Sequence, residues 1–277
     1  MAAALDGASG RRVGTVEYHV GVFVAITRQV SPAFAACELT HLERVPIDLD
    51  RARTQHHAYE QALVAAGGLV QQLAADADIP DSVFVEDCAI VFPELAIITR
   101  PGAAPRRAET PAVARALAAF RPLCAVEAPG TVDGGDVLVA GHRVFVGLST
   151  RTNEAAVAQL RAVLTPHGYT VCACEVGGCL HLKSAATALD DATLLVNPSW
   201  IEPAVFGGLA IVEVDVAEPS AANALRLHDR LIFPAAFPRT AAALERRGHR
   251  VERVEADELA KAEGAVTCCS LIVESRG

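Results

Sequence analysis

The sequence predicts an α/β protein in which five similar modules close into a ring. Strands and helices alternate along the 277 residues, and the order strand, strand, helix, strand recurs with a period near 45 residues. Such periods are typical of solenoids, propellers and arrays, and a closed ring removes the exposed ends that a solenoid must cap. A doubly wound parallel sheet is the alternative. The ring is favoured because one polar residue recurs at the same point of each module, at intervals of 46, 48, 42 and 45 residues: Asp87, Asp133, His181, Asn223 and Cys268.

The elements follow from apolar periodicity and turn residues. Residues 18–27 predict a strand, and residues 51–66 predict an amphipathic helix because Tyr59, Leu63 and Val64 share one face. Further strands are expected at 83–90, 95–99, 136–140, 144–148, 182–189, 193–196, 224–227, 230–233, 251–254 and 271–273. Further helices are expected at 111–120, 153–164 (capped by Thr152 or Asn153), 238–248 and 257–263, with a shorter, irregular one after Pro198.

One module of the ring is composite. The N-terminal strand and the C-terminal strand together supply it, which brings the number of modules to five. Residues 1–15 are rich in Ala, Gly and Arg and are expected to form a flexible arm. Residues 16–277 are expected to form a single domain.

Composition restricts the partners. The net charge of −9 and the pI near 5.5 argue against nucleic acid or an anionic membrane and suit a small cationic molecule. The eight cysteines are mostly scattered among apolar residues, which indicates buried thiols in a reducing compartment. The N-terminus lacks a secretory leader, and the early apolar run 20–26 is too short to span a bilayer. We therefore expect a soluble, cytoplasmic protein.

Two adjacent cysteines precede the last predicted strand. Successive strand side chains point to opposite faces, so only one of Cys268 and Cys269 can face a cleft while the other packs. A thiolate is the attacking form of cysteine, and its ordinary pKa is about 8.5. A histidine is suited to proton transfer at neutral pH. Cys268 and His181, which keep the rhythm of the modules, are thus a candidate catalytic pair.

Seven short motifs resemble one enzyme family. They occur in order from about Val22 to the end of the chain: DSVFVED at 81–87, TRPG at 99–102, DGGDV at 133–137, FVGLS at 145–149, RTN at 151–153, LHLKS at 180–184 and TCCS at 267–270. Together they resemble dimethylarginine dimethylaminohydrolase, also called dimethylargininase. This family belongs to the guanidino-modifying (pentein) superfamily, so the resemblance implies a five-bladed, pseudo-symmetric α/β propeller.

The resemblance also implies roles for individual residues. Cys268 matches the nucleophile, His181 the general acid/base, and Asp133 the acid that orients the histidine. Arg106 and Arg151 match residues that hold the amino-acid end of the substrate, and Arg107 is a credible substitute for Arg106. The substrate-binding positions carried over, with Leu39 and Ala262 acting through their backbone, are Leu39, Asp81, Glu86, Asp87, Arg106, Arg151 and Ala262.

The implied reaction is hydrolysis of mono- or asymmetrically dimethylated L-arginine to L-citrulline and methylamine or dimethylamine, through an S-alkylthiouronium on Cys268. An arginine deiminase, acting on arginine or another substituted arginine, is one alternative. Deiminases carry an acid two residues after the catalytic histidine, where this chain has Lys183. A second alternative is a binding protein, because a ribosome-binding factor shares the ring fold. The joint presence of Cys268, His181 and the acids favours an enzyme.

No metal or cofactor is expected. A zinc site normally has three or four closely paired ligands, a pattern that the spacing of Cys268, His181 and the acids lacks. Cys172, Cys174 and Cys179 form a partial cluster without a clear fourth ligand. Zinc could still inhibit through Cys268 and His181. The expected assembly is a monomer or a homodimer with a small cationic amino acid as its substrate.

Overall fold

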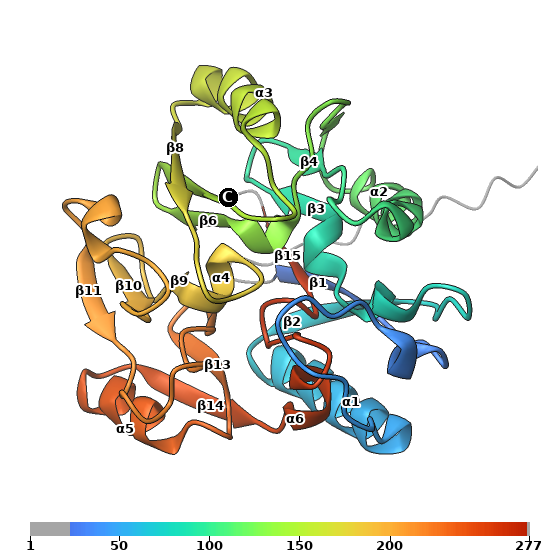
Figure 1. The fold of residues 1–277 in the computed structure, drawn as a ribbon, viewed down its shortest axis with the longest axis vertical. Coiled ribbons are helices and arrows are strands. Elements are labelled where there is room, and N and C mark those ends of the chain that lie inside the picture. Colours follow the sequence, from blue (N-terminus) through green and yellow to red (C-terminus); the bar gives the residue numbers. More distant parts are fainter. Residues whose placement is uncertain (1–22, 276–277) are drawn as a thin grey trace, which may run out of the picture.

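The computed structural model describes residues 23–275, whose strands form five separate three-stranded sheets around a common centre (Figure 1). The sheets, each given from the inner to the outer strand in pairing order, are β15 (Leu271–Glu274), β1 (Phe23–Arg28) and β2 (Gly68–Leu73); β3 (Ala89–Val91), β4 (Ala96–Ile98) and β5 (Leu123–Ala125); β6 (Val137–Ala140), β7 (Arg143–Leu148) and β8 (Thr170–Glu175); β9 (Ala186–Ala188), β10 (Thr193–Val196) and β11 (Ala210–Glu213); β12 (Leu225–Leu227), β13 (Arg230–Pro234) and β14 (Arg250–Val254).

Each sheet is one blade with the same topology. Its first two strands pair antiparallel, and the second and third pair parallel. A parallel pair needs a crossover, usually a helix. These crossovers lie outside the ring of sheets in Figure 1 and are α1 (Leu49–Ala65), α2 (Thr110–Leu117), α3 (Glu154–Leu164), the 3₁₀ helix η7 (Pro203–Phe206) and α5 (Pro238–Arg246). The predicted five-bladed α/β propeller of strand-strand-helix-strand modules is confirmed.

The first blade closes the ring. β15 pairs antiparallel with β1, with Phe23 opposite Glu274 and Ile26 opposite Leu271. The two ends of the described chain therefore complete one blade, as the sequence predicts. The expected arm at 1–15 and the first part of the expected strand at 18–27 lie outside the described residues.

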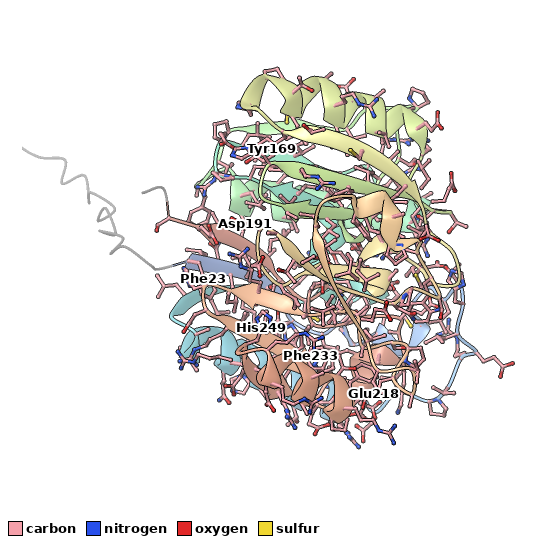
Figure 2. The ribbon with its side chains drawn as sticks, turned by 90° about the vertical axis from the view of Figure 1, so that its left-hand side faces the viewer. Phe23, Tyr169, Asp191, Glu218, Phe233 and His249 are labelled. Carbon is pink, nitrogen blue, oxygen red and sulfur yellow. The ribbon has the colours of Figure 1, made fainter. Side chains whose placement is uncertain are left out.

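The core lies between neighbouring blades, because each cluster of buried apolar side chains joins residues of two of them. Phe145 of β7 and Phe206 of η7 meet edge to face with ring centroids 5.0 Å apart. Phe233 of β13, labelled in Figure 2, is fully buried between the fourth and fifth blades. Burying one such side chain contributes roughly 1.5–3 kcal/mol. Asn153 caps α3 by accepting the Ala156 N–H at 3.0 Å, which confirms one of the two expected caps.

Two expected strands begin later than predicted. Residues 83–88 belong to the 3₁₀ helices η2 (Pro80–Val83) and η3 (Val85–Cys88) around Phe84, and residues 182–185 form α4 (Leu182–Ala185). The apolar residues there are buried because the chain turns toward the centre, and burial in a turn gives the same apolar run as burial in a strand. The outer strands β2, β5, β8 and β11 are not individually predicted. β2, for example, exposes several of its residues and contains two glutamines.

The remaining short elements complete the path of the chain. They are η1 (Phe34–Ala36), η4 (Ala104–Glu109), η5 (Gly134–Asp136), η6 (Thr165–His167) and α6 (Asp257–Ala260). Within residues 23–275, no helix is both long and apolar enough to cross a membrane.

Candidate active site

The polar residues of the sequence rhythm occupy equivalent positions in the blades. Each lies in the segment just before an inner strand: Asp87 before β3, Asp133 before β6, His181 before β9, Asn223 before β12 and Cys268 before β15. α4 and the start of β15 lie near the centre of the ring in Figure 1. The repeat therefore brings residues that are remote in sequence to one end of the central axis.

Three of these residues line a common cavity. Asp87, His181 and Cys268 share it with residues from the first four blades, among them Arg151 after β7 and Leu180 before β9, and from the segment before β15. Its free volume is about 10 Å³, roughly the room of one water molecule, so a ligand of amino-acid size enters only if the lining segments move apart. The lining residues are Glu38, Asp81, Phe84, Asp87, Arg106, Arg151, Leu180, His181, Ala262, Glu263, Gly264 and Cys268.

His181 is buried between carboxylates. Its Nε2 lies 3.1 Å from Asp133 Oδ2, and its Nδ1 lies 3.9 Å from Asp87 Oδ1. Burial alone would lower the pKa of His181, but Asp87, Asp136 and Asp133 outweigh it and raise the pKa to about 9. The imidazole is therefore protonated at neutral pH and can donate a proton.

Two glycines allow the chain to approach this histidine closely. A Cβ at Gly135 would lie 2.6 Å from His181 Nδ1, and one at Gly134 would lie 2.0 Å from the backbone oxygen of Glu86. Real Cβ atoms do not reach such distances. The Gly134-Gly135 pair thus makes room for the imidazole and for η3.

Asp133 holds the His181 ring, and Asp136 holds the backbone next to it. Asp133 Oδ1 accepts the Gly102 N–H at 2.9 Å, which leaves Oδ2 facing His181. Asp136 Oδ1 accepts the Leu182 N–H at 2.9 Å, and its Oδ2 accepts the hydroxyls of Ser149 and Thr152 at 2.6 Å each. Asp136 lies in the DGGDV motif at 133–137, but nothing in the sequence pattern assigns it a role.

The two cysteines have separate environments. Cys269 is fully buried in the core of the first blade, and Cys268 is partly exposed and lines the cavity. They lie in a turn and not in a strand, so the alternation of strand side chains does not explain the difference. Burial raises the pKa of Cys268, and the charges of Glu86 and Asp87 raise it further. The thiol is therefore neutral in the free protein.

Arg106 is held by carboxylates on two sides. Its Nε and Nη2 donate to the two oxygens of Glu109 at 2.9 Å each, and its Nη1 donates to Asp87 Oδ2 at 2.5 Å. Burial would raise the pKa of Asp87, but His181 and Arg106 outweigh it and lower the pKa to about 2. Asp87 Oδ1 also accepts the Gly135 N–H at 2.9 Å. Nothing in the sequence analysis singled out Glu109.

Arg151 retains an unused donor. Its Nη2 donates to Thr40 Oγ1 at 3.1 Å, and its buried Nη1 has no hydrogen-bond partner among the described residues. Nη1 lies 3.8 Å from Asp133 Oδ2, which is too far for a hydrogen bond. By contrast, Arg107 donates to the backbone oxygen of Pro101 and does not line the cavity.

The wall formed by the first blade is tied together by carboxylates. Asp81 Oδ2 accepts the Glu38 N–H at 3.1 Å. Glu263, which sequence reasoning missed and which has a left-handed φ of 58°, accepts the backbone N–H groups of Thr40, His41 and Leu42. Leu39 lies in this segment, half-buried against the first-blade core.

Glu86 faces away from Asp87. Its Oε1 accepts from Lys183 Nζ at 2.7 Å, and its Oε2 accepts from Thr267 Oγ1 at 2.8 Å. Asn223 donates to Thr267 Oγ1 at 2.9 Å and to the Lys183 carbonyl at 3.1 Å. Glu86, Lys183 and Thr267 line a second cavity, of about 530 Å³, whose walls include residues of all five inner strands. The Glu86–Lys183 pair thus lies next to Cys268 without lining the smaller cavity.

One group of side chains has the spacing of cation ligands. Atoms of Asp87, Asp133 and His181 lie within 4.8 Å of one another. The Arg106 guanidinium already provides a positive partner for Asp87, and a protonated His181 provides one for Asp133. The arrangement suits proton transfer and the binding of an organic cation.

Comparisons with known proteins agree with this geometry. The chain is 44% identical over 252 residues to the N(G),N(G)-dimethylarginine dimethylaminohydrolase of Streptomyces coelicolor, covering 89% of this chain and 95% of the relative. It is 37% identical over 226 residues to the enzyme of that name from Pseudomonas aeruginosa, covering 81% and 89%. No family model matches the sequence.

Solved structures show the same fold. A Cys-to-Ser mutant of the Pseudomonas aeruginosa protein, complexed with citrulline, superposes with a TM-score of 0.86 at 35% identity, covering 90% of this chain and 98% of that one. The N-terminal domain of ArgZ, described as an arginine dihydrolase from cyanobacteria, superposes with a TM-score of 0.82 at 17% identity, covering 91% and 98%. The second likeness concerns the fold alone.

Proposed function

Because the chain belongs to the dimethylarginine dimethylaminohydrolase family, we propose that it hydrolyses Nω-methylated L-arginine to L-citrulline and methylamine or dimethylamine. The observation that carries the proposal is the convergence of Cys268, Asp87 and the His181–Asp133 pair on one cavity. A thiol, a protonated imidazole and a carboxylate are the groups required to attack, protonate and hold a guanidinium.

The substrate is held at both ends. Asp87 is ionised and takes the guanidinium as a charge-assisted hydrogen-bond acceptor. The free Nη1 of Arg151 takes the α-carboxylate, assisted by the Nη1 proton of Arg106 that Asp87 does not use. Asp81 and the backbone of Leu39 and Ala262 complete the amino-acid end.

Glu86 lies beside Cys268, where its backbone N–H donates to the Cys268 carbonyl at 3.1 Å. Its two carboxylate oxygens accept from Lys183 and Thr267, so it acts on the substrate through its charge and by holding the segments of Lys183 and Thr267 in place. Lys183 stands where deiminases have a further acid, which leaves one side of the guanidinium less tightly held and suits methyl groups.

The reaction proceeds through a covalent intermediate. The Cys268 thiolate attacks the central guanidinium carbon, and His181 donates its proton to the departing amine, which leaves an S-alkylthiouronium on the sulfur. The neutral His181 then takes a proton from water as that water attacks the same carbon. Collapse of the tetrahedral adduct forms the C=O bond and breaks the C–S bond, which releases citrulline and the thiolate, and the hydroxyl proton passes to solvent. Asp133 holds the imidazole in line and stabilises its cationic form.

Substrate binding itself ionises the nucleophile. Burial and nearby acids keep the Cys268 thiol neutral in the free protein, and a guanidinium placed beside it favours the thiolate. Alkylation of Cys268 by iodoacetamide is therefore expected to become faster near neutral pH when a cationic ligand occupies the cavity. Identical pH dependence with and without ligand would contradict this step.

The eight free cysteines suit a reducing compartment, so we place the protein in the cytoplasm. Its assembly as a monomer or a homodimer stays a prediction.

Citrulline formation from a panel of substituted arginines tests the function. Wild-type protein is expected to act on mono- and dimethylarginine in preference to arginine, and Cys268→Ser is expected to abolish turnover while leaving the fold intact. Cys124→Ser, which alters a thiol in β5 outside the cavity, is the matched control and is expected to retain full activity. Full activity of Cys268→Ser would contradict the mechanism. A preference for arginine would identify arginine, and not a methylated arginine, as the substrate.

A further inference from the structure

Glu109 is a buried carboxylate whose polar contacts lie with Arg106 and a thiol. It is fully buried at the end of η4, three residues after Arg106, and does not line the cavity. Its Oε1 and Oε2 accept from Nε and Nη2 of Arg106 at 2.9 Å each, and the Cys88 thiol lies 3.6 Å from Oε2. This is the two-bond geometry in which a guanidinium and a carboxylate fit best.

Glu109 occupies the Nε–Nη2 edge of the Arg106 guanidinium, and this determines which N–H groups remain for Asp87. A guanidinium binds one carboxylate bidentately through a pair of parallel N–H groups. Glu109 takes the Nε–Nη2 pair, and Nη2 also donates to the backbone oxygens of Phe84 and Asp81 at 3.2 and 3.4 Å. Asp87 therefore receives one bond, from Nη1 to Oδ2. Asp87 Oδ1 receives one further bond, from the Gly135 N–H. Each carboxylate oxygen accepts about two hydrogen bonds, so each oxygen of Asp87 can accept one more, from a ligand.

Glu109 also balances charge. The Arg106 guanidinium is buried and lines the cavity that, in the proposed function, receives a second guanidinium. Two cations that line or occupy the same low-dielectric cavity repel each other unless a carboxylate neutralises one of them. Glu109 provides that neutralisation and leaves the charge of Asp87 for the ligand.

We propose that Glu109 is a positioning residue that occupies the bidentate edge of Arg106 and thereby keeps Asp87 open to the guanidinium of the substrate. This inference rests on the proposed function for the identity of the ligand. Without the Glu109 charge, Asp87 is the strongest remaining acceptor within reach of Arg106. The guanidinium then turns its paired N–H groups to Asp87, fills both oxygens and repels an incoming cation.

Binding measurements separate this role from a structural one. In a Cys268→Ser background, which prevents turnover, calorimetry compares dimethylarginine, a cation, with citrulline, whose side chain is neutral. Glu109→Gln is expected to weaken dimethylarginine binding by roughly 10-fold or more, the range of a charge-assisted hydrogen bond, and citrulline binding by less than about threefold. In the otherwise wild-type enzyme the same substitution is expected to raise KM more than it lowers kcat.

A second buried glutamate provides the matched control. Glu218, labelled in Figure 2, accepts the Arg239 and Thr240 N–H groups at 2.9 and 2.8 Å at the start of α5, outside the cavity. Glu218→Gln is expected to lower thermal stability without changing the affinity for either ligand. If Glu109→Gln behaves like Glu218→Gln, or weakens both ligands equally, Glu109 is structural and the proposal is overturned.

A shorter acid keeps the test valid if Glu109→Gln does not fold. Glu109→Asp retains the charge but reaches Arg106 with one methylene fewer, so a several-fold loss for dimethylarginine is expected, and an unchanged affinity overturns the proposal. Absence of turnover in the wild-type protein would sink the proposed function alone. The difference between the two ligands would still decide the role of Glu109.

Discussion

A single methyl group on Gly135 tests whether the close approach of the backbone to His181 governs catalysis. The Cβ of Gly135→Ala would lie 2.6 Å from His181 Nδ1, 2.9 Å from its Cγ and 3.0 Å from Asp87 Oδ1. None of these three atoms is the far end of a flexible, exposed side chain, since both residues are buried. The imidazole or η5 must therefore move.

The size of the movement follows from ordinary contact distances. Non-bonded carbon atoms prefer separations of about 3.5–4.0 Å, so relieving the 2.6 Å contact displaces the imidazole by roughly 1 Å. The 3.1 Å contact between His181 Nε2 and Asp133 cannot be kept after such a shift unless Asp133 follows. A misplacement of about 1 Å costs on the order of 100-fold in rate, so kcat is expected to fall by about that factor.

The assay is citrulline production at saturating dimethylarginine, with thermal unfolding measured in parallel. Gly177→Ala is the matched control, because nothing lies within 4 Å of a Cβ there and the residue precedes the same histidine in the chain. The control is expected to retain wild-type activity and stability. A Gly135→Ala enzyme that is folded and within about threefold of wild type would refute the idea that this glycine positions His181.

Two further outcomes follow from charges in the cavity. The pKa of His181, raised from 6.5 to about 9 in the folded state, gives stability that is complete below pH 6.5 and is lost as the pH rises through about 9. Denaturant unfolding between these pH values is expected to show a decline of at most about 3 kcal/mol, which His181→Gln should remove; an equal slope in both proteins would contradict the assignment. Arg151→Met removes the unpartnered donor and is expected to raise KM by roughly 10-fold or more, whereas Arg107→Met, outside the cavity, should leave KM unchanged. Should the two substitutions exchange these effects, the carboxylate is held at Arg107.

The fold was predictable from the sequence because it repeats. Polar residues that recur before short apolar runs indicate the same local structure five times, and β15 closes the ring where a strand at 271–273 was expected to do so. What periodicity could not separate was a buried strand from a buried turn, as at η3 and α4. Both present apolar side chains to the interior, and the difference lies in backbone hydrogen bonds such as that from Glu86 N–H to the Cys268 carbonyl.

The candidate site was predictable only in part, for a related reason. One cavity is lined by four of the predicted residues: Cys268, His181, Asp87 and Arg151. The first three lie just before an inner strand of their blade, and Arg151 follows β7. Glu109 acts through another side chain, and its position three residues from Arg106 carries no pattern beyond that of an ordinary helix ion pair. Residues of this kind are recognised by burial and partners, which a single sequence does not contain.

The charges around the cavity explain why the nucleophile and the substrate must be considered together. Asp87 and Asp133 face the His181 cation, and the Glu109–Arg106 pair is neutral by itself. Burial raises the pKa of Cys268, and a thiolate there would also place negative charge beside Glu86 and Asp87, which raises that pKa further. A guanidinium brings the one positive charge that this thiolate lacks. A neutral ligand of the same shape would leave the sulfur protonated, so the cavity selects for a cation at the chemical step as well as at binding.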